Sequence, residues 1–226
     1  MKCLCNKPAP PGSEGLCYKS DLYKAEIKTK KLSSWAAITK ELDKLTTLSK
    51  KKETDYLFRG QSRCSWGLQT PFERAFDAIG PMKKTRTETE VGLVRLFKRQ
   101  FPQFGVPVPE DGNYMEWLAL MRHHGAPTRL LDWTYSFYVA IFFAIEDIEG
   151  AVGESAVWAI STKWLEEQVK TRITPSPWNL VGTDGSDPNC QTPETFKEAF
   201  RSKLTFVINM NSYKLSERQV IQQGTF

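Results

Sequence analysis

The sequence predicts a single α+β domain, with buried and flanking helices around a central mixed or antiparallel sheet. Short stretches rich in β-branched and aromatic residues, at 56–59, 156–161 and 204–210, are typical of strands. Longer segments between them carry apolar residues at helical spacing. The 226 residues are 40% hydrophobic and 25% charged, which is ordinary for one globular core.

The first predicted helix covers residues 31–48. Apolar residues recur there every three to four positions, which is typical of an amphipathic helix, and Ser33 or Ser34 is the expected N-cap. Before it, residues 1–20 form a lead that contains proline and glycine. We therefore expect residues 1–53 to be an N-terminal lead and helix, and residues 54–226 to be the domain proper.

Three further helices are predicted before the second strand. Apolar residues are phased along 88–101 and 114–124, and the second of these helices places His124 on its apolar face. Gly125 is the expected residue just after that helix. Residues 136–147 are apolar on nearly every side, which predicts a buried helix.

Composition excludes several classes of protein. The net charge of +5 favours anionic partners such as nucleotides, phosphates or nucleic acid. Five cysteines without framework spacing argue against a disulfide-stapled secreted domain, and no metal site is expected. The longest apolar run, 137–145, is too short to cross a bilayer, so we expect a cytoplasmic protein without membrane contact.

The strongest functional signal is the segment from His123 to Thr134. It connects an amphipathic helix to the apolar helix, and it compresses an imidazole at His124, a cation at Arg129 and a carboxylate at Asp132 into a few residues. Buried polar clusters are costly unless every member is paired, so such a cluster is either a satisfied network or a site. In the first case Asp132 is a helix cap and Arg129 its ion-pair partner.

The second signal is the strand that ends at Arg59. A guanidinium at a strand end, followed by Gly60, is well placed to hold phosphate or carboxylate in a bidentate manner. The alternative is that Arg59 pairs with an acidic residue such as Asp132.

A third signal lies near the end of the chain. Ser216 and Gln219 have the spacing of a capping box, which predicts a helix to Gly224. Arg218 and Gln222 share a face of that helix, although solvated surface explains them equally well.

These motifs together resemble the FRG domain family, named for its Phe-Arg-Gly signature, over residues 56–226. The matching residues are Leu57-Phe58-Arg59-Gly60-Gln61, then His124-Gly125 and Pro127-Thr128-Arg129-Leu130-Leu131-Asp132-Trp133-Thr134, and finally Arg218, Gln223, Gly224 and Phe226. The resemblance implies a bacterial or phage-associated protein and a role in phage defence. The order of polar residues is also loosely similar to that of ADP-ribosyltransferases, which hold NAD.

Two functions from different classes are compatible with this pattern. In the first, an NAD-using, ADP-ribosyltransferase-like enzyme has Arg59, His124 and Asp132 as catalytic residues and a protein or nucleic acid as acceptor. In the second, a sensor module without turnover binds a nucleotide or a protein. The candidate ligand-binding residues are Gln61, Arg129, Thr134, Arg218 and Gln223. The enzyme requires that Arg59 and the segment from His124 to Asp132 line one cavity.

Overall fold

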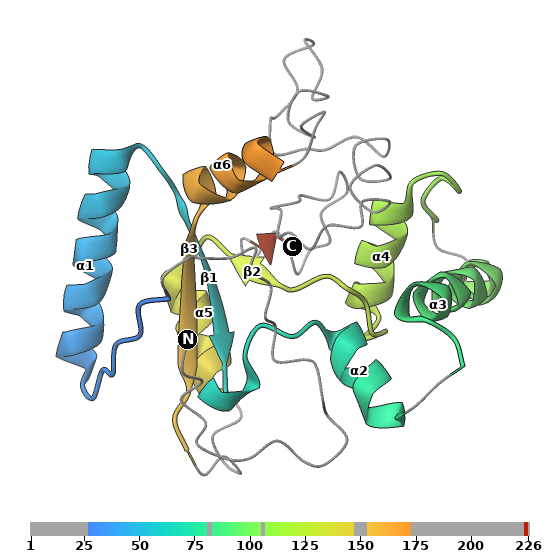
Figure 1. The fold of residues 1–226 in the computed structure, drawn as a ribbon, viewed down its shortest axis with the longest axis horizontal. Coiled ribbons are helices and arrows are strands. Elements are labelled where there is room, and N and C mark those ends of the chain that lie inside the picture. The colour runs from blue at the N-terminus through green and yellow to red at the C-terminus, as the bar shows by residue number, and fades with distance from the viewer. Residues whose placement is uncertain (1–26, 81–82, 105–106, 147–152, 173–223, 226) are drawn as a thin grey trace.

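The computed structural model describes residues 27–80, 83–104, 107–146, 153–172 and 224–225. Within these residues, six α-helices and a four-stranded antiparallel sheet make one α+β domain, which confirms the predicted fold class (Figure 1). The elements are α1 (Trp35–Lys52), β1 (Tyr56–Gln61), η1 (Cys64–Trp66), α2 (Pro71–Ile79), α3 (Arg86–Gln100), η2 (Phe101–Phe104), α4 (Tyr114–His123), β2 (Trp133–Thr134), α5 (Phe137–Ile145), β3 (Ala156–Ser161), α6 (Thr162–Arg172) and β4 (Gly224–Thr225).

The sheet has the strand order β3-β1-β2-β4. Strand β1 pairs with β3 along its whole length and with β2 through Phe58 and Thr134. Side chains alternate along β1, so Phe58 packs edge-to-face on Phe137 of α5, while Leu57 faces the opposite side and is buried with Leu165 of α6. The central strand is thus covered by a different helix on each face.

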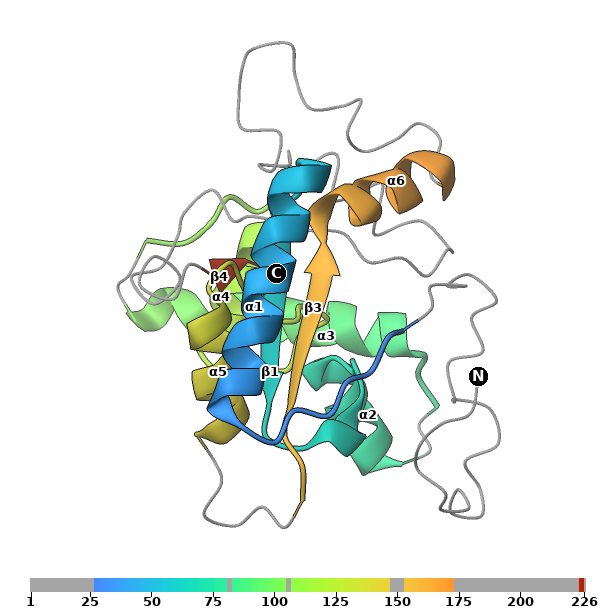
Figure 2. The ribbon, with the colours of Figure 1, turned by 90° about the vertical axis from the view of Figure 1, so that its left-hand side faces the viewer.

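Gly60 allows α5 to lie directly against β1. A Cβ atom at Gly60 would lie 1.9 Å from the carbonyl oxygen of Ala140 and 2.7 Å from the backbone nitrogen of Ala144. Both alanines are buried, and Figure 2 shows α5 beside β1. The glycine of the Phe-Arg-Gly signature is therefore a packing requirement.

The prediction that residues 136–147 form a helix buried on nearly every side is wrong. The side of α5 that faces β1 is buried, but Tyr138 and Phe142 are 58% and 54% exposed. The helix covers only one face of a narrow sheet, so its other side lies at the surface. Among the described helices, none combines the length and apolar character needed to cross a bilayer.

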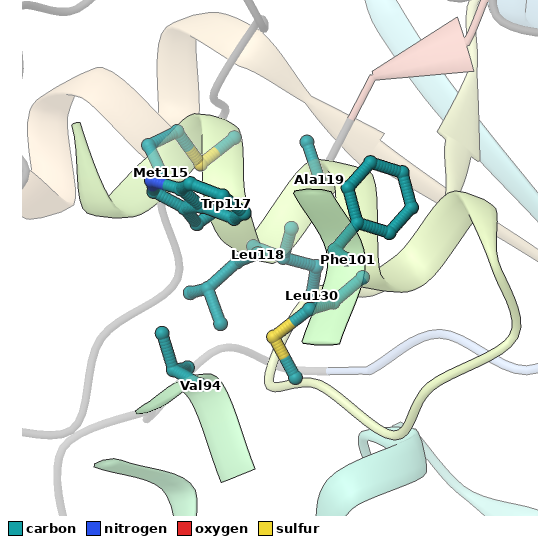
Figure 3. Close-up of a cluster of buried hydrophobic side chains, with 8 residues drawn as sticks. Val94, Phe101, Met115, Trp117, Leu118, Ala119 and Leu130 are labelled. Carbon is teal, nitrogen blue, oxygen red and sulfur yellow. The ribbon is translucent and has the colours of Figure 1, made fainter. Parts of the chain in front are cut away.

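A second core lies between α3, η2 and α4, and Figure 3 shows it. Its buried members are Val94, Phe101, Met115, Trp117, Leu118, Ala119, Met121 and Leu130. Gly125 follows the C-cap residue of α4, and its φ of 76° is left-handed. The N–H of Gly125 donates to the Arg122 carbonyl (3.1 Å) and that of Ala126 to the Met121 carbonyl (2.9 Å), which confirms Gly125 as the residue that follows the helix end.

The helices begin at residues whose side chains accept hydrogen bonds from the free backbone N–H groups of the first turn. Ser34 caps α1 by accepting from the backbone N–H of Ala37 (3.2 Å), as predicted. Thr85 and Glu88 form a full capping box at the start of α3. The predicted strand at 204–210 and nearly all of the predicted helix from Ser216 lie outside the described residues.

Candidate functional site

The two distant pieces of chain that the sequence singled out meet within β1, which continues past Arg59 to Gln61, so the prediction that the strand ends at Arg59 is wrong. The Nη1 atom of Arg59 donates to the backbone carbonyl of Asp132 at 2.6 Å. The pairing of Phe58 with Thr134 brings these residues together, because it aligns β1 with the stretch that follows Asp132. Arg59 does bond to Asp132, but through the main chain.

The carboxylate of Asp132 is held by a residue that the sequence analysis missed. Arg122 of α4 donates from Nε to both carboxylate oxygens, at 3.1 and 3.0 Å, and from Nη2 to Oδ2 as well. The turn at Gly125 reverses the chain after α4, so that Arg122 faces a residue ten positions later. The one available signal was that Arg122 lies next to the His123–Thr134 segment.

Three guanidiniums lie close enough to Asp132 to influence one another's protonation. Burial lowers the pKa of Arg59, the Asp132 carboxylate opposes this shift, and Arg122 and Arg74 add to it. Arg74 on α2 also has a lowered pKa, caused first by desolvation and then by Arg122. Hydrogen bonds to Asp132 raise the pKa of Arg122. We call Arg59, Arg74, Arg122 and Asp132 the arginine cluster.

One donor in this cluster lacks a partner within the described part of the chain. The Nε atom of Arg59 is buried and has no hydrogen-bond acceptor there. An unsatisfied buried donor costs free energy on the order of 1–3 kcal/mol. The cluster therefore combines an excess of positive charge with an unfilled hydrogen-bonding position, which suits an anion.

His124 contacts a different part of the molecule. It is the C-cap residue of α4, its ring lies 4.9 Å from that of Phe101 and 5.1 Å from that of His123, and the residue is exposed. Its backbone N–H still donates to the Leu120 carbonyl (3.1 Å), and its ring lies beside Phe101 and Phe97, so it continues the apolar face as expected, although the residue is exposed. Its catalytic role stays a prediction.

One comparison with known proteins identifies the family of this part of the chain. Residues 54–151 match the family model of the FRG domain. The chain carries an FRG domain. The match includes β1 through α5, and hence every member of the arginine cluster. Neither a curated protein nor a solved structure matches the chain.

Two predicted ligand-binding residues of the FRG domain have bonding partners inside the protein. Gln61 is 3% exposed, donates from Nε2 to the Gly67 carbonyl (2.7 Å) and accepts from the indole nitrogen of Trp158 (2.6 Å). Thr134 is also buried, and its hydroxyl accepts from the Ser136 backbone (3.0 Å). Both side chains brace the loops around β1 and β2, and their ligand role stays a prediction.

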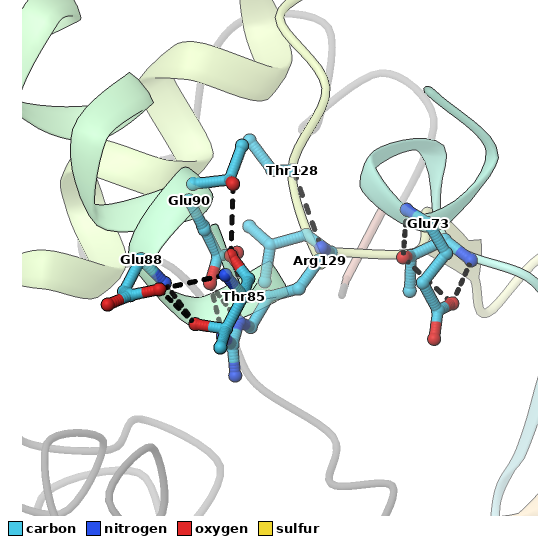
Figure 4. Close-up of polar contacts among 9 residues, drawn as sticks. Glu73, Thr85, Glu88, Glu90, Thr128 and Arg129 are labelled. Carbon is cyan, nitrogen blue, oxygen red and sulfur yellow. Dashed lines mark hydrogen bonds and ion pairs between the residues drawn. The ribbon is translucent and has the colours of Figure 1, made fainter. Parts of the chain in front are cut away.

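Arg129 forms an ion pair with Glu90 of α3 (Figure 4). Its Nε atom lies 2.9 and 2.8 Å from the two carboxylate oxygens, and Glu90 is fully buried. The interpretation of Arg129 as the partner of Asp132 is therefore wrong, since Arg122 takes that place. In the FRG domain, Arg129 joins the segment before β2 to α3.

The remaining candidates lie outside the described residues or apart from the cluster. Arg218 and Gln223 are not among the described residues. Within those that are described, no group of three or more metal-ligating side chains occurs. A polar hollow of about 440 Å³ between α1, α6 and the connection from α1 to β1, lined by residues such as Asp55 and Lys163, does not include Arg59 or Asp132.

Proposed function

We propose that the FRG domain binds a phosphate-bearing nucleotide at the arginine cluster. The observation that carries the proposal is the gathering of three guanidiniums at Asp132. Arg122 of α4 holds its carboxylate, Arg59 of β1 donates to its carbonyl, and Arg74 of α2 lies close enough to interact electrostatically with both arginines. The carboxylates of Asp132 and of Glu73, which acts on Arg74, do not fully balance three cations, so an anionic ligand would be favoured electrostatically. Guanidiniums also match phosphate geometry, because they donate two parallel hydrogen bonds.

The position of Arg59 supports a ligand with several acceptor oxygens. One of its nitrogens is committed to the Asp132 carbonyl, and its buried Nε has no acceptor within the described residues. A diphosphate oxygen at Nε would supply that acceptor and offset the cost of burying the charge. Arg74 is exposed and would bind the second phosphate group of the same ligand.

NAD belongs to this ligand class, and its turnover is the second candidate function. Asp132 is favoured as a catalytic residue because Arg122 holds both of its oxygens in place. In an ADP-ribosyl transfer, the bond between nicotinamide and ribose breaks, and nicotinamide leaves with the bonding electrons. Asp132 would stabilise the positive ribose, and a nucleophile of a protein or nucleic acid would bond to it and lose a proton. A bacterial phage-defence system is the setting that the FRG resemblance implies.

A binding module without turnover uses the same cluster, so the test separates binding from chemistry. Purified protein is titrated with NAD, ADP and inorganic phosphate by calorimetry, and NAD consumption is followed in lysate. We expect ADP and NAD to bind more tightly than phosphate, and Arg59→Ala and Arg122→Ala to weaken binding by about tenfold or more.

The matched control is Arg63→Ala. Arg63 is an exposed arginine close to Arg59 in sequence, but its guanidinium lies over the ring of Trp66 at 5.8 Å. Unchanged affinity in this variant, together with the losses above, supports the proposal. Equal losses in all three variants, or no binding by the wild type, would overturn it. NAD binding without consumption would assign the domain to the sensor class.

A further inference from the structure

A shallow groove of about 550 Å³ follows the outer side of α3. The inner side of the helix holds the buried residues Glu90 and Val94. Figure 1 shows α3 at the edge of the molecule, beside α2 and α4 and away from the sheet. This groove shares no residue with the arginine cluster. The groove is therefore a different site from the proposed nucleotide-binding site.

A glycine lies at the centre of the groove, at a helix position where no contact within the described protein requires one. Gly92 lies in the middle of α3, where glycine is less favourable than alanine. A Cβ atom there would meet nothing within 4 Å, so no neighbouring element requires the close approach. Beside it, Leu96 is 49% exposed and Leu93 half-buried. The missing side chain leaves a notch with apolar side chains next to it.

The rim of the groove carries three cations, of which Arg95 and Arg99 form no ion pair in the described part of the chain, while Lys84 interacts electrostatically with Glu88. Lys84, Arg95 and Arg99 line it and are exposed. Neighbouring cations behave differently, because Arg86 pairs with Asp77 (2.7 Å) and Lys98 with Asp111 (3.6 Å).

Glu88 is the acidic residue among the groove's lining. Its carboxylate accepts from the backbone N–H of Thr85 at 2.8 Å and from the Thr85 hydroxyl at 2.9 Å, as part of the helix cap. It is therefore committed to the start of α3.

We propose that this groove binds an acidic amphipathic helix of a partner protein. An apolar side chain of the partner would enter the notch at Gly92 and contact Leu96, and its carboxylates would pair with Arg95 and Arg99. Charge complementarity selects the partner, since three cations, two of them unpaired, flank the apolar notch. A single-stranded nucleic acid fits less well, because no aromatic side chain for base stacking lines the groove.

The test uses a fluorescent helical peptide of about 15 residues, with leucines on one face and glutamates on the other. A second peptide replaces the glutamates with lysines. We expect saturable binding of the first peptide only. Gly92→Gln, which fills the notch and is the better helix former, should weaken binding by about tenfold without lowering the thermal unfolding midpoint.

Charge variants complete the design. Arg95→Glu, and the milder Arg99→Gln, should also weaken binding, while Lys51→Glu on α1 should leave it unchanged. The proposal is overturned when the peptide does not bind, when the lysine peptide binds equally well, or when the Gly92 and Arg95 variants bind like the wild type. Displacement of the peptide by a single-stranded oligonucleotide of higher affinity also overturns it, in favour of nucleic acid.

Discussion

At the scale of single residues, the Asp132 side chain sets the charge of the arginine cluster. It is 47% exposed and Arg122 is 26% exposed, so water screens their attraction. A pair with this exposure contributes about 1 kcal/mol or less to stability. The bidentate geometry therefore matters more for holding the carboxylate in place than for holding the fold together.

Asp132→Asn tests whether the Asp132 carboxylate matters for the charge of the arginine cluster more than for the stability of the fold. The substitution removes a negative charge from the cluster, so we expect ADP to bind about fivefold more tightly at low salt, with a loss of stability of about 1 kcal/mol or less. NAD turnover, where it occurs, should fall, because the ribose cation loses its counter-charge. Calorimetry and chemical unfolding measure both quantities, with Asp111→Asn, whose side chain is 98% exposed, as the control. Weaker ADP binding by the variant would contradict the account.

The glycine of the Phe-Arg-Gly signature, Gly60, is required for close packing of α5 on β1 and not for backbone flexibility. We expect Gly60→Ala to lower the free energy of unfolding by about 3 kcal/mol, because the added methyl group would overlap the backbone of α5. Gly92→Ala is the matched control, since its methyl group meets nothing within 4 Å and should stabilise α3 by about 0.5–1 kcal/mol. Denaturant unfolding of the two variants decides the point, and similar effects of both would argue against this packing role.

Arg122 shows what sequence reasoning missed at this scale. The Phe-Arg-Gly and His124–Thr134 motifs indicated Arg59 and Asp132 correctly as neighbours, because strand pairing brings them together. Arg122 and Arg74 come from helices whose relative placement depends on tertiary packing, and no local pattern reports it.

At the scale of elements, α3 depends on a cap within the helix and on an ion pair with the segment before β2, in addition to its packing on α4 and η2. Its start is fixed by the capping box of Thr85 and Glu88, and its middle by the ion pair of Glu90 with Arg129. The hydrogen bonds from Thr85 lower the pKa of Glu88. A carboxyl group whose pKa is lower in the folded state stabilises the fold above its unfolded pKa of 4.5, and this contribution is lost as the pH falls through the folded value.

Thr85→Ala should therefore change stability in a pH-dependent way. We expect a lower free energy of unfolding at pH 7, and a smaller difference from the wild type as the pH falls below 4.5, where Glu88 becomes protonated in both proteins. Thr87→Ala, at an exposed position in the same turn, serves as the control. Urea unfolding between pH 3 and pH 7 makes the comparison, and a constant difference across that range would rule out the Glu88 linkage.

The ion pair gives a second element-scale prediction. Arg129→Met leaves the Glu90 carboxylate buried without its charged partner and should cost about 3 kcal/mol. The double variant Glu90→Leu with Arg129→Met removes both charges and should recover much of that loss. Equal instability of the single and double variants would show that Arg129 acts through other contacts.

Element prediction succeeded where the periodic signal was long. The expected helices at 31–48, 88–101 and 114–124 correspond to α1, α3 and α4, and the expected strands at 56–59 and 156–161 to β1 and β3. Strand β2 has only two residues, so it carries no alternation to detect, and its position depends on pairing with β1. The exposed side of α5 was missed because an apolar sequence alone does not say which side meets the sheet.

At the scale of the whole molecule, the sheet and the α3–α4 core meet at the arginine cluster. Strand β1 supplies Arg59, α4 supplies Arg122, and the connection from α4 to β2 supplies Asp132. The predicted meeting of Arg59 with Asp132 thus occurs where two packed units join, while His124 packs on the η2 side. A ligand bound there would contact both units.

The Nε–H group of Arg59 offers the most direct measurement of nucleotide binding. In an isotope-edited NMR spectrum, its resonance is assigned by its disappearance in Arg59→Lys. The account predicts that this resonance moves saturably as ADP is added, because a phosphate oxygen becomes its hydrogen-bond acceptor, while the Nε–H of Arg63 does not move. An Arg59 resonance that stays in place at saturating ADP would contradict nucleotide binding at the arginine cluster.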